Sequence, residues 1–214
     1  MKTIPISVLT VLLACTAFGQ EHGQDSHFNF NIGGGIGFPL SDTGNFVNNG
    51  ANFVVGGGPN VNHVIGFSGE FMWHDLPLKS SVIRQLGIPG ANSRQYSLTG
   101  NLILRLPTHG EFGAYFIGGG GWYRRNEQAL APTIVAGTVC SPFWSWWGAC
   151  TTGLFPANVV IGSRTSDALG GNVGGGVTFH VAENFKFYAE VRYHHASYGR
   201  GSTDILPLTF GFRW

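Results

Sequence analysis

Residues 185–194 read Phe-Lys-Phe-Tyr-Ala-Glu-Val-Arg-Tyr-His, and their alternation decides the fold. Positions 185, 187, 189, 191 and 193 carry aromatic or aliphatic side chains, and Lys, Tyr, Glu, Arg and His stand between them. Neighbouring side chains of a β-strand point to opposite faces. A period of two therefore predicts a strand with one apolar face and one polar face.

The same alternation recurs along the chain. It is clear in residues 28–38, 65–74, 95–106 and 206–214. Three further strands are expected near residues 51–60, 112–124 and 166–181. Glycine runs and aromatic residues on both faces blur the first two of these, and the facing of the strand at 112–124 stays open. The sequence thus predicts eight strands.

The connections between these strands alternate in length. Short ones are expected at residues 60–63, 107–111 and 182–184, and long ones at 39–50, 75–93, 126–165 and 195–203. Short periplasmic turns on one rim and long extracellular loops on the other are typical of a membrane barrel. The pattern predicts an all-β fold, an eight-stranded antiparallel up-and-down transmembrane β-barrel.

A soluble β-sandwich or lipocalin-like barrel would also alternate, but with its apolar face inside. Charged residues make up 11% of the chain, against about 25% in ordinary soluble domains. The interior of an eight-stranded barrel is only wide enough for one set of side chains. Glycine, hydroxyl and charged residues are therefore expected in the lumen, with Phe, Leu and Trp facing lipid.

The N-terminus is typical of an export signal. Lys2 precedes a short apolar stretch over residues 4–15, and small residues before Gln20 suit cleavage. We predict a cleaved signal peptide over 1–19, a short segment over 20–27 and the barrel domain over 28–214. Lipidation of Cys15 is the alternative to its removal. The mature chain would be neutral, so no basic surface indicates nucleic acid.

Charges inside a dry lumen should pair, because a lone buried charge is costly. The expected lumen network consists of Glu70, Arg105, Lys186, Glu190, Arg192 and Arg213. We expect it to plug the barrel, with a polar track for a small solute as the alternative. Aromatic residues near strand ends predict membrane girdles. The expected girdles consist of Phe28, Phe185 and Trp214 at the periplasmic boundary, and Phe38, Trp73, Tyr96 and Tyr193 at the outer one.

Three stretches carry a resemblance to a known family: GAYFIGGGGWYRR at 113–125, LGGNVGGGVTFHVAENFKFYAEVRYHH at 169–195, and ILPLTFGFRW at 205–214. The chain resembles the small eight-stranded outer-membrane barrels represented by the OmpA transmembrane domain and OmpX. The resemblance implies a monomer in the outer membrane of a Gram-negative-type bacterium, in contact with lipid and lipopolysaccharide. It also implies recognition of the C-terminal strand by the barrel-assembly machinery, with Trp214 in place of the commoner Phe.

The fold alone does not fix an activity. We favour a non-enzymatic barrel with an envelope-structural or loop-mediated binding and adhesion role. The alternative is a hydrolase, because Arg192-x-x-His195-x-Ser197 resembles a stretch of lipid A deacylases. His195 would be the base and Ser197 the nucleophile, with Asp204 as the nearest downstream carboxylate. Tyr198 departs from that pattern, in which Asn follows the Ser.

The longest connection holds the cysteines that remain after cleavage, Cys140 and Cys150, and an exported pair predicts a disulfide. Between them lie three tryptophans that form a candidate contact surface: Trp144, Trp146 and Trp147. β-Branched residues on both sides of the pair suggest that the strands extend as a hairpin above the membrane. No cofactor is expected, and no metal, because His194 and His195 are adjacent and point to opposite faces.

Overall fold

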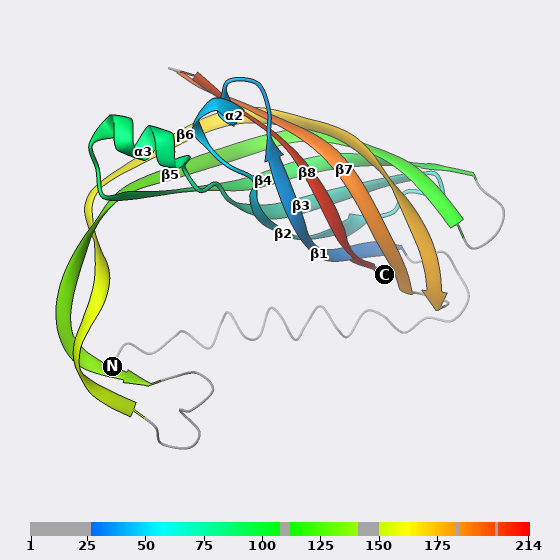
Figure 1. The fold of residues 1–214 in the computed structure, drawn as a ribbon. Coiled ribbons are helices and arrows are strands. Elements are labelled where there is room, and N and C mark those ends of the chain that lie inside the picture. The colour runs from blue at the N-terminus through cyan, green and yellow to red at the C-terminus, as the bar shows by residue number, and fades with distance from the viewer. Residues whose placement is uncertain (1–26, 108–111, 141–149, 183–184, 200) are drawn as a thin grey trace.

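The computed structural model describes residues 27–107, 112–140, 150–182, 185–199 and 201–214. In these ranges eight antiparallel strands form one closed barrel, in which neighbours in sequence pair and β8 returns to pair with β1 (Figure 1). The strands are β1 (Phe28–Pro39), β2 (Gly50–Pro59), β3 (Ile65–Asp75), β4 (Gly90–Leu106), β5 (Phe112–Cys140), β6 (Cys150–Ala182), β7 (Phe185–Tyr198) and β8 (Gly201–Arg213). This confirms the predicted fold class.

Two short helices of the described ranges, α2 (Thr43–Phe46) and α3 (Ser80–Leu86), lie in the first two long connections. They sit at the same end of the barrel (Figure 1). The two connections bind each other, since the Lys79 amide donates to the Phe46 carbonyl at 2.9 Å. No helix in the described part of the chain is long and apolar enough to cross a membrane.

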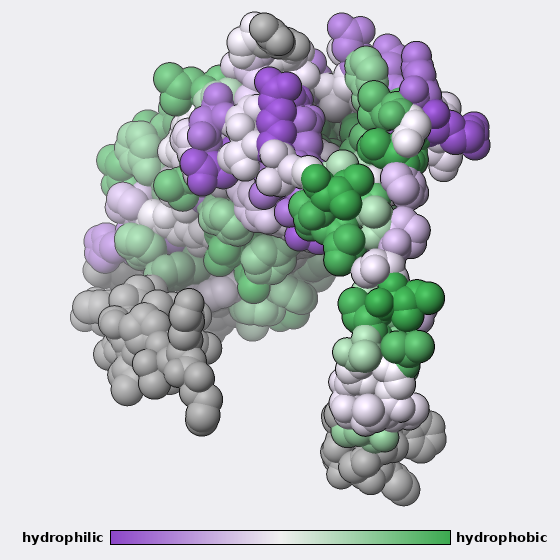
Figure 2. All heavy atoms as spheres, turned by 90° about the vertical axis from the view of Figure 1, so that its left-hand side faces the viewer, coloured by the Kyte–Doolittle hydropathy of each residue, from purple (hydrophilic) through white to green (hydrophobic). Residues whose placement is uncertain are grey.

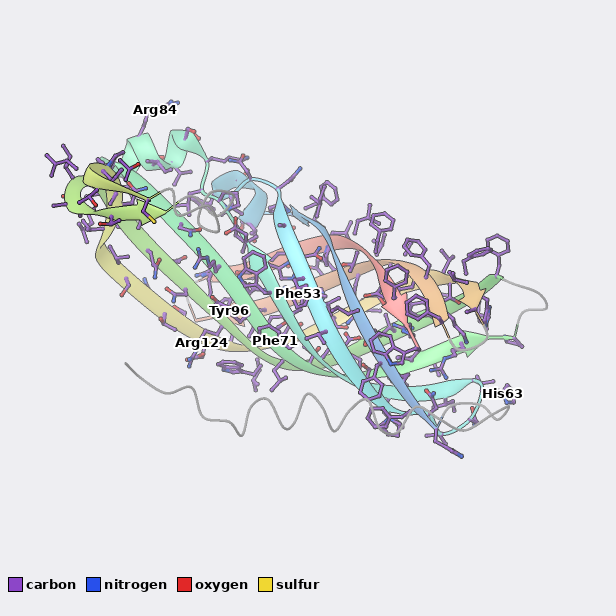
Figure 3. All side chains as sticks on the ribbon, turned by 90° about the horizontal axis from the view of Figure 1, so that it is seen from below. Phe53, His63, Phe71, Arg84, Tyr96 and Arg124 are labelled. Carbon is purple, nitrogen blue, oxygen red and sulfur yellow. The ribbon has the colours of Figure 1, made fainter. Side chains whose placement is uncertain are left out.

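The two faces of the wall follow the sequence pattern. Ser68 and Gln95 point inward and are 2% exposed or less, whereas Phe67 and Leu98 of the same strands are 47% and 59% exposed. Figure 3 shows the labelled aromatic residues of β2, β3 and β4 along the wall, with His63 at the short-turn end and Arg84 at the other. The apolar side chains thus form the outer surface of the barrel.

The structure also shows the facing of β5, which the sequence left open. Tyr115, Ile117 and Tyr123 are buried in the lumen, whereas Phe116 and Trp122 are exposed on the outer wall. The run Gly118–Gly121 between them carries no side chains that could mark either face. The strand nevertheless keeps the period of two across that run.

The lumen accommodates bulky rings because glycines stand opposite them. A Cβ on Gly176 would lie 2.6 Å from the Tyr115 hydroxyl, and one on Gly170 would lie 2.8 Å from the Tyr123 ring. Glycine in one strand therefore provides the space for a tyrosine in its neighbour. This is how a narrow eight-stranded barrel holds tyrosines that the sequence analysis did not assign to its interior.

β5 and β6 are far longer than the other strands, at 29 and 33 residues. β4 pairs with β5 as far as Gly90–Leu130, and β6 pairs with β7 as far as Gly170–Ala196. Beyond these pairs β5 and β6 continue as a two-stranded hairpin that curves away from the barrel (Figure 1). The long connection predicted over 126–165 is therefore strand for most of its length.

The long loop predicted over residues 195–203 is wrong. β7 continues to Tyr198 and β8 begins at Gly201, with His195 in register with Asp204 and Ser197 in register with Ser202. Hydrogen bonds between side chains of this segment support the extended ladder, since the Ser202 hydroxyl donates to Asp204 at 2.9 Å. The fourth long connection is thus a continuation of the barrel wall.

Candidate functional site

The middle of the lumen is filled by an ionic network centred on Arg192. Its guanidinium binds Glu70 on one side and Glu190 on the other, where Nη2 lies 2.5 Å from Oε1 and Nε donates at 2.8 Å. Arg213 approaches Glu190 at 3.9 Å. These four side chains are all buried. Two carboxylates thus balance two guanidiniums, as charges in a low-dielectric interior require.

Neutral donors complete this network. Glu70 accepts hydrogen bonds from the amides of Asn101 at 3.0 Å and Asn31 at 3.2 Å, and from the Ser68 hydroxyl at 3.3 Å. The Tyr115 hydroxyl donates to Glu190 at 2.8 Å. The alternation of the sequence puts Asn31, Ser68 and Asn101 on the same face as the lumen residues, but it does not indicate that they bind the carboxylates. Such pairings across the lumen depend on the barrel's geometry.

Of the other two residues predicted for the lumen network, Arg105 lies apart from its centre. Arg105 donates to Asn60 Oδ1 at 2.6 Å, near the short turn between β2 and β3. Lys186 is half-buried and in register with Arg213. The structure therefore brings Glu70, Glu190, Arg192 and Arg213 into one cluster and places Arg105 nearer the rim.

The predicted girdle residues fall into two groups. Phe28 and Trp214 each lie against the Phe30 ring, at 4.7 Å and 5.9 Å between centroids, and Phe185 lies 6.4 Å from Trp214. At the other end of the barrel the structure places four residues on the outer face: Phe38, Trp73, Tyr96 and Tyr193. The Tyr193 hydroxyl donates to Asp204 at 2.5 Å.

A polar cluster on the outer face surrounds Asp204. The His195 ring lies 2.7 Å from its carboxylate through Nδ1, and Ser202 and Tyr193 also donate to it. The Asp204 side chain is 7% exposed and the His195 side chain 48%. Ser197 is exposed on the same face of β7, two residues beyond His195. Within the described ranges, no hydrogen bond joins Ser197 to the His195 ring.

The hairpin of β5 and β6 presents apolar side chains above the rim. Ile134 and Leu154 are 71% and 73% exposed, and the β-branched residues at 159–161 are exposed as well. Figure 2 shows hydrophobic residues along this protruding arm. In the sequence, residues 128–163 contain no Asp, Glu, Lys, Arg or His. The hairpin is thus an uncharged arm with apolar side chains in solvent.

Charged residues resume at the base of this arm. Arg124 donates to Asp167 through Nε at 2.8 Å and Nη2 at 3.1 Å, a bidentate pair across the two strands. This pair lowers the pKa of the Asp167 carboxyl. The uncharged surface therefore has a defined lower boundary.

The tip of the arm carries the two cysteines, and the register sets Cys140 opposite Cys150. Directly opposed residues in an antiparallel pair have Cα atoms about 4.5–5.5 Å apart, which suits a disulfide. The predicted disulfide is compatible with this register. The predicted contact surface of Trp144, Trp146 and Trp147 lies outside the described residues.

Comparison with known proteins gives a family match over nearly the whole chain. A family model described as "Outer membrane protein beta-barrel domain" matches residues 7–213. The comparison with curated protein sequences found no match.

Solved structures with a similar fold are outer-membrane barrels. Neisserial surface protein A has a TM-score of 0.56 and 16% identity, with 88% of this chain and 96% of that chain covered. A major outer membrane protein from Thermus thermophilus has a TM-score of 0.50 and 10% identity, with 87% and 98% covered. The attachment invasion locus protein Ail of Yersinia pestis has a TM-score of 0.49 and 16% identity, with 87% and 97% covered. At these identities the likeness is one of fold.

Proposed function

We propose that this chain, which belongs to the family of outer membrane protein beta-barrel domains, is a non-enzymatic binding protein that engages a protein partner through its β5–β6 hairpin. The observation that carries the proposal is the uncharged arm that projects beyond the rim. Ile134 and Leu154 are largely exposed on it, although water is an unfavourable environment for both. Exposed apolar surface of this kind marks interaction sites.

The barrel itself supports a role that depends on the rim and not on a channel. Arg192 and its two carboxylate partners occupy the middle of the lumen, and tyrosine rings fill the space beside inward glycines. An eight-stranded barrel has an interior just wide enough for such side chains. Solute passage through the lumen is therefore the less favoured function, and the exposed arm is the favoured one.

The arm also offers backbone groups for recognition. Beyond Leu130 on β5 and before Gly170 on β6, the two strands pair with each other and each has an outer edge. An extended segment of a partner can add to such an edge as a further strand, with side-chain packing providing specificity. An adhesion-type role fits this arrangement.

The experiment compares adhesion of cells that express the wild-type chain or a variant. Ile134→Ser/Leu154→Ser removes the two most exposed aliphatic side chains of the arm, and Asn158→Ser is the matched polar control on the same hairpin. The probe is a surface coated with extracellular-matrix protein. We expect a loss of at least about tenfold in bound cells for the double variant and none for the control. Equal adhesion by all three strains would contradict the proposal.

We infer a second candidate function, a lipid-modifying esterase, from one observation. The Asp204 carboxylate binds the His195 ring at 2.7 Å and lies in register with it, which is the orientation that a base requires. Ser197 would be the nucleophile. The test is release of acyl chains from lipid A by the purified protein, with Ser197→Ala and His195→Gln as controls. No release by the wild-type protein would exclude this function.

Biogenesis and location are part of the proposal. The family match supports an outer-membrane location in a Gram-negative-type bacterium, reached through the signal over residues 1–19. Trp214 exchanges backbone hydrogen bonds with Phe30 at 2.8 and 3.0 Å, so the C-terminal end helps to close the barrel. This supports recognition of the last strand by the barrel-assembly machinery. We propose a monomer in contact with lipid and lipopolysaccharide, and the mass of the mature N-terminus distinguishes cleavage from lipidation of Cys15.

A further inference from the structure

Two histidines meet inside the lumen, where His194 is in register with Asn172 of β6. His74 on β3 and His194 on β7 are each 1% exposed. Their rings lie 5.8 Å apart between centroids, with an interplanar angle of 72°. Neither residue pairs with the ionic network around Arg192 in the described structure. The cluster is thus a separate feature of the lumen.

The ring nitrogens of this pair are largely without hydrogen-bond partners. Both nitrogens of His74 and the Nε2 atom of His194 are buried and unpaired in the described structure. The buried amide nitrogen of Gln95 and the buried hydroxyl of Ser97 are unpaired too. Leaving buried polar atoms unsatisfied costs free energy, so a group that binds between the two rings would be favoured.

The third element of the cluster is Tyr123 on β5, which orients His194. Its hydroxyl lies 3.0 Å from His194 Nδ1 and donates to the Gly171 carbonyl at 3.5 Å. Because a tyrosine hydroxyl has one proton, it must accept from His194 Nδ1 when it donates to Gly171. In that tautomer, with the proton on Nδ1, His194 has a lone pair on Nε2. Histidines that bind metals use this arrangement, with the second nitrogen held by an outer partner.

The separation of the rings suits a bridging ion. A metal–nitrogen bond of about 2.0 Å places the ion about 3.1 Å from each ring centre. If one nitrogen of each ring faces the ion, a centroid separation of 5.8 Å corresponds to a nitrogen–metal–nitrogen angle of about 140°. This lies between trigonal and linear coordination, the low coordination numbers of a soft monovalent ion.

The charges and donors nearby select among metals. Met72 is buried on the inner face of β3, two residues before His74, and its thioether is a soft ligand. Glu70 and Glu190 are already engaged by Arg192, whose positive charge lies two residues from His194. Among the described residues, a hard divalent ion such as Mg²⁺ or Ca²⁺ would find no free carboxylate here, whereas a soft monovalent ion needs none.

We propose that His74 and His194 form a two-histidine site for one copper(I) ion in the lumen, with Tyr123 as a positioning residue. The sequence predicted no metal, because His194 and its neighbour His195 point to opposite faces of the strand. His74 is 120 positions away in the chain, and only the closed barrel brings it to His194. This site is independent of the proposed role of the hairpin.

The experiment titrates the purified full chain in detergent with copper(I), under anaerobic conditions with ascorbate and against a chromophoric copper(I) chelator. Ascorbate leaves disulfides intact, so thiolates of the hairpin do not compete. We expect one copper per chain, at least about tenfold weaker binding for His74→Gln and for His194→Gln, and about 10–100-fold weaker binding for Tyr123→Phe. His63→Gln, in the exposed turn between β2 and β3, is the matched control and should bind like the wild type.

Each result of the copper titration either supports the two-histidine site or overturns it. Absence of copper binding by the wild type, wild-type affinity in His74→Gln, or a preference for zinc over copper would each overturn the proposal. Heat-modifiable mobility in gels shows whether each variant folds. If a histidine variant fails to fold, X-ray absorption of the copper-loaded wild type decides. Two imidazole nitrogens at about 2.0 Å support the site, and coordination without imidazole refutes it.

Discussion

Replacement of Glu70 by Gln should destabilise the barrel strongly, because it leaves a positive charge in the lumen. The central network holds Glu70 and Glu190 against Arg192 and Arg213, so it is neutral. Removal of one carboxylate charge leaves a net charge of +1 in that cluster. Breaking a buried pair in this way costs about 3–5 kcal/mol. Since Arg192 keeps Glu190, we expect the lower end, about 3 kcal/mol of the free energy of unfolding.

The measurement is urea unfolding of the protein refolded into lipid vesicles, followed by tryptophan fluorescence. Glu127→Gln is the matched control, because it makes the same change in a pair with Arg125, 3.1 Å apart, in which Glu127 is 42% exposed. Exposed pairs contribute about 0–1 kcal/mol, so this variant should differ little from the wild type.

A double-mutant cycle tests the reason for the effect. Glu70→Gln/Arg192→Met removes one charge of each sign and leaves Glu190 with Arg213. If the cost arises from an unbalanced charge, the double variant should lose less than the sum of the single variants, by about 2 kcal/mol or more. Additive losses, or a Glu70→Gln variant within about 1 kcal/mol of the wild type, would refute this explanation.

Three further outcomes follow from the packing of the wall and the hairpin. Gly119→Ala should destabilise the barrel by about 1–3 kcal/mol in the same urea assay, because its Cβ would lie 2.6 Å from Asn101 Oδ1 and closer still to a backbone carbonyl. Gly100→Ala has nothing within 4 Å of its Cβ and should be nearly neutral, so equal effects would contradict the packing argument. Reduction of the predicted Cys140–Cys150 bond should let a protease cut the hairpin while the barrel band survives on a gel; unchanged cleavage rates would contradict the disulfide. Deletion of Trp214 should slow barrel closure in refolding assays, since two backbone hydrogen bonds to β1 are lost, and an unchanged rate would show that the final residue is dispensable.

The fold could be predicted because a membrane wall has two chemically different faces. Most strands record the difference in their alternation, as at Phe187 and Tyr188, and no long-range information is needed. The facing of β5 could not be predicted, because Gly118–Gly121 provides no side chain to mark a face. The residues at which β7 ends and β8 begins could not be predicted either, because His195 and Ser197 are polar and the alternation stops there.

The contacts of the candidate sites could be predicted from the sequence only where they join neighbouring strands. Asp204 was identified as the nearest downstream acid, and the register places it beside His195 because neighbouring strands of a hairpin meet in order. Contacts across the lumen follow no such order. Glu70 and Arg192 are 122 positions apart, and their meeting depends on the stagger of all eight strands. Composition predicted that lumen charges would pair, but only the closed barrel determines which ones do.

The interior of the barrel and its exposed arm differ in their charge. The lumen holds buried charges around Arg192 that must balance one another. Residues 128–163 carry no charge at all, so the arm adds no electrostatic field of its own. The proposed recognition of a partner by the arm would then depend on apolar contact and backbone pairing, which salt screens weakly. Adhesion through the arm should therefore persist at high ionic strength, whereas a rim-charge mechanism would weaken.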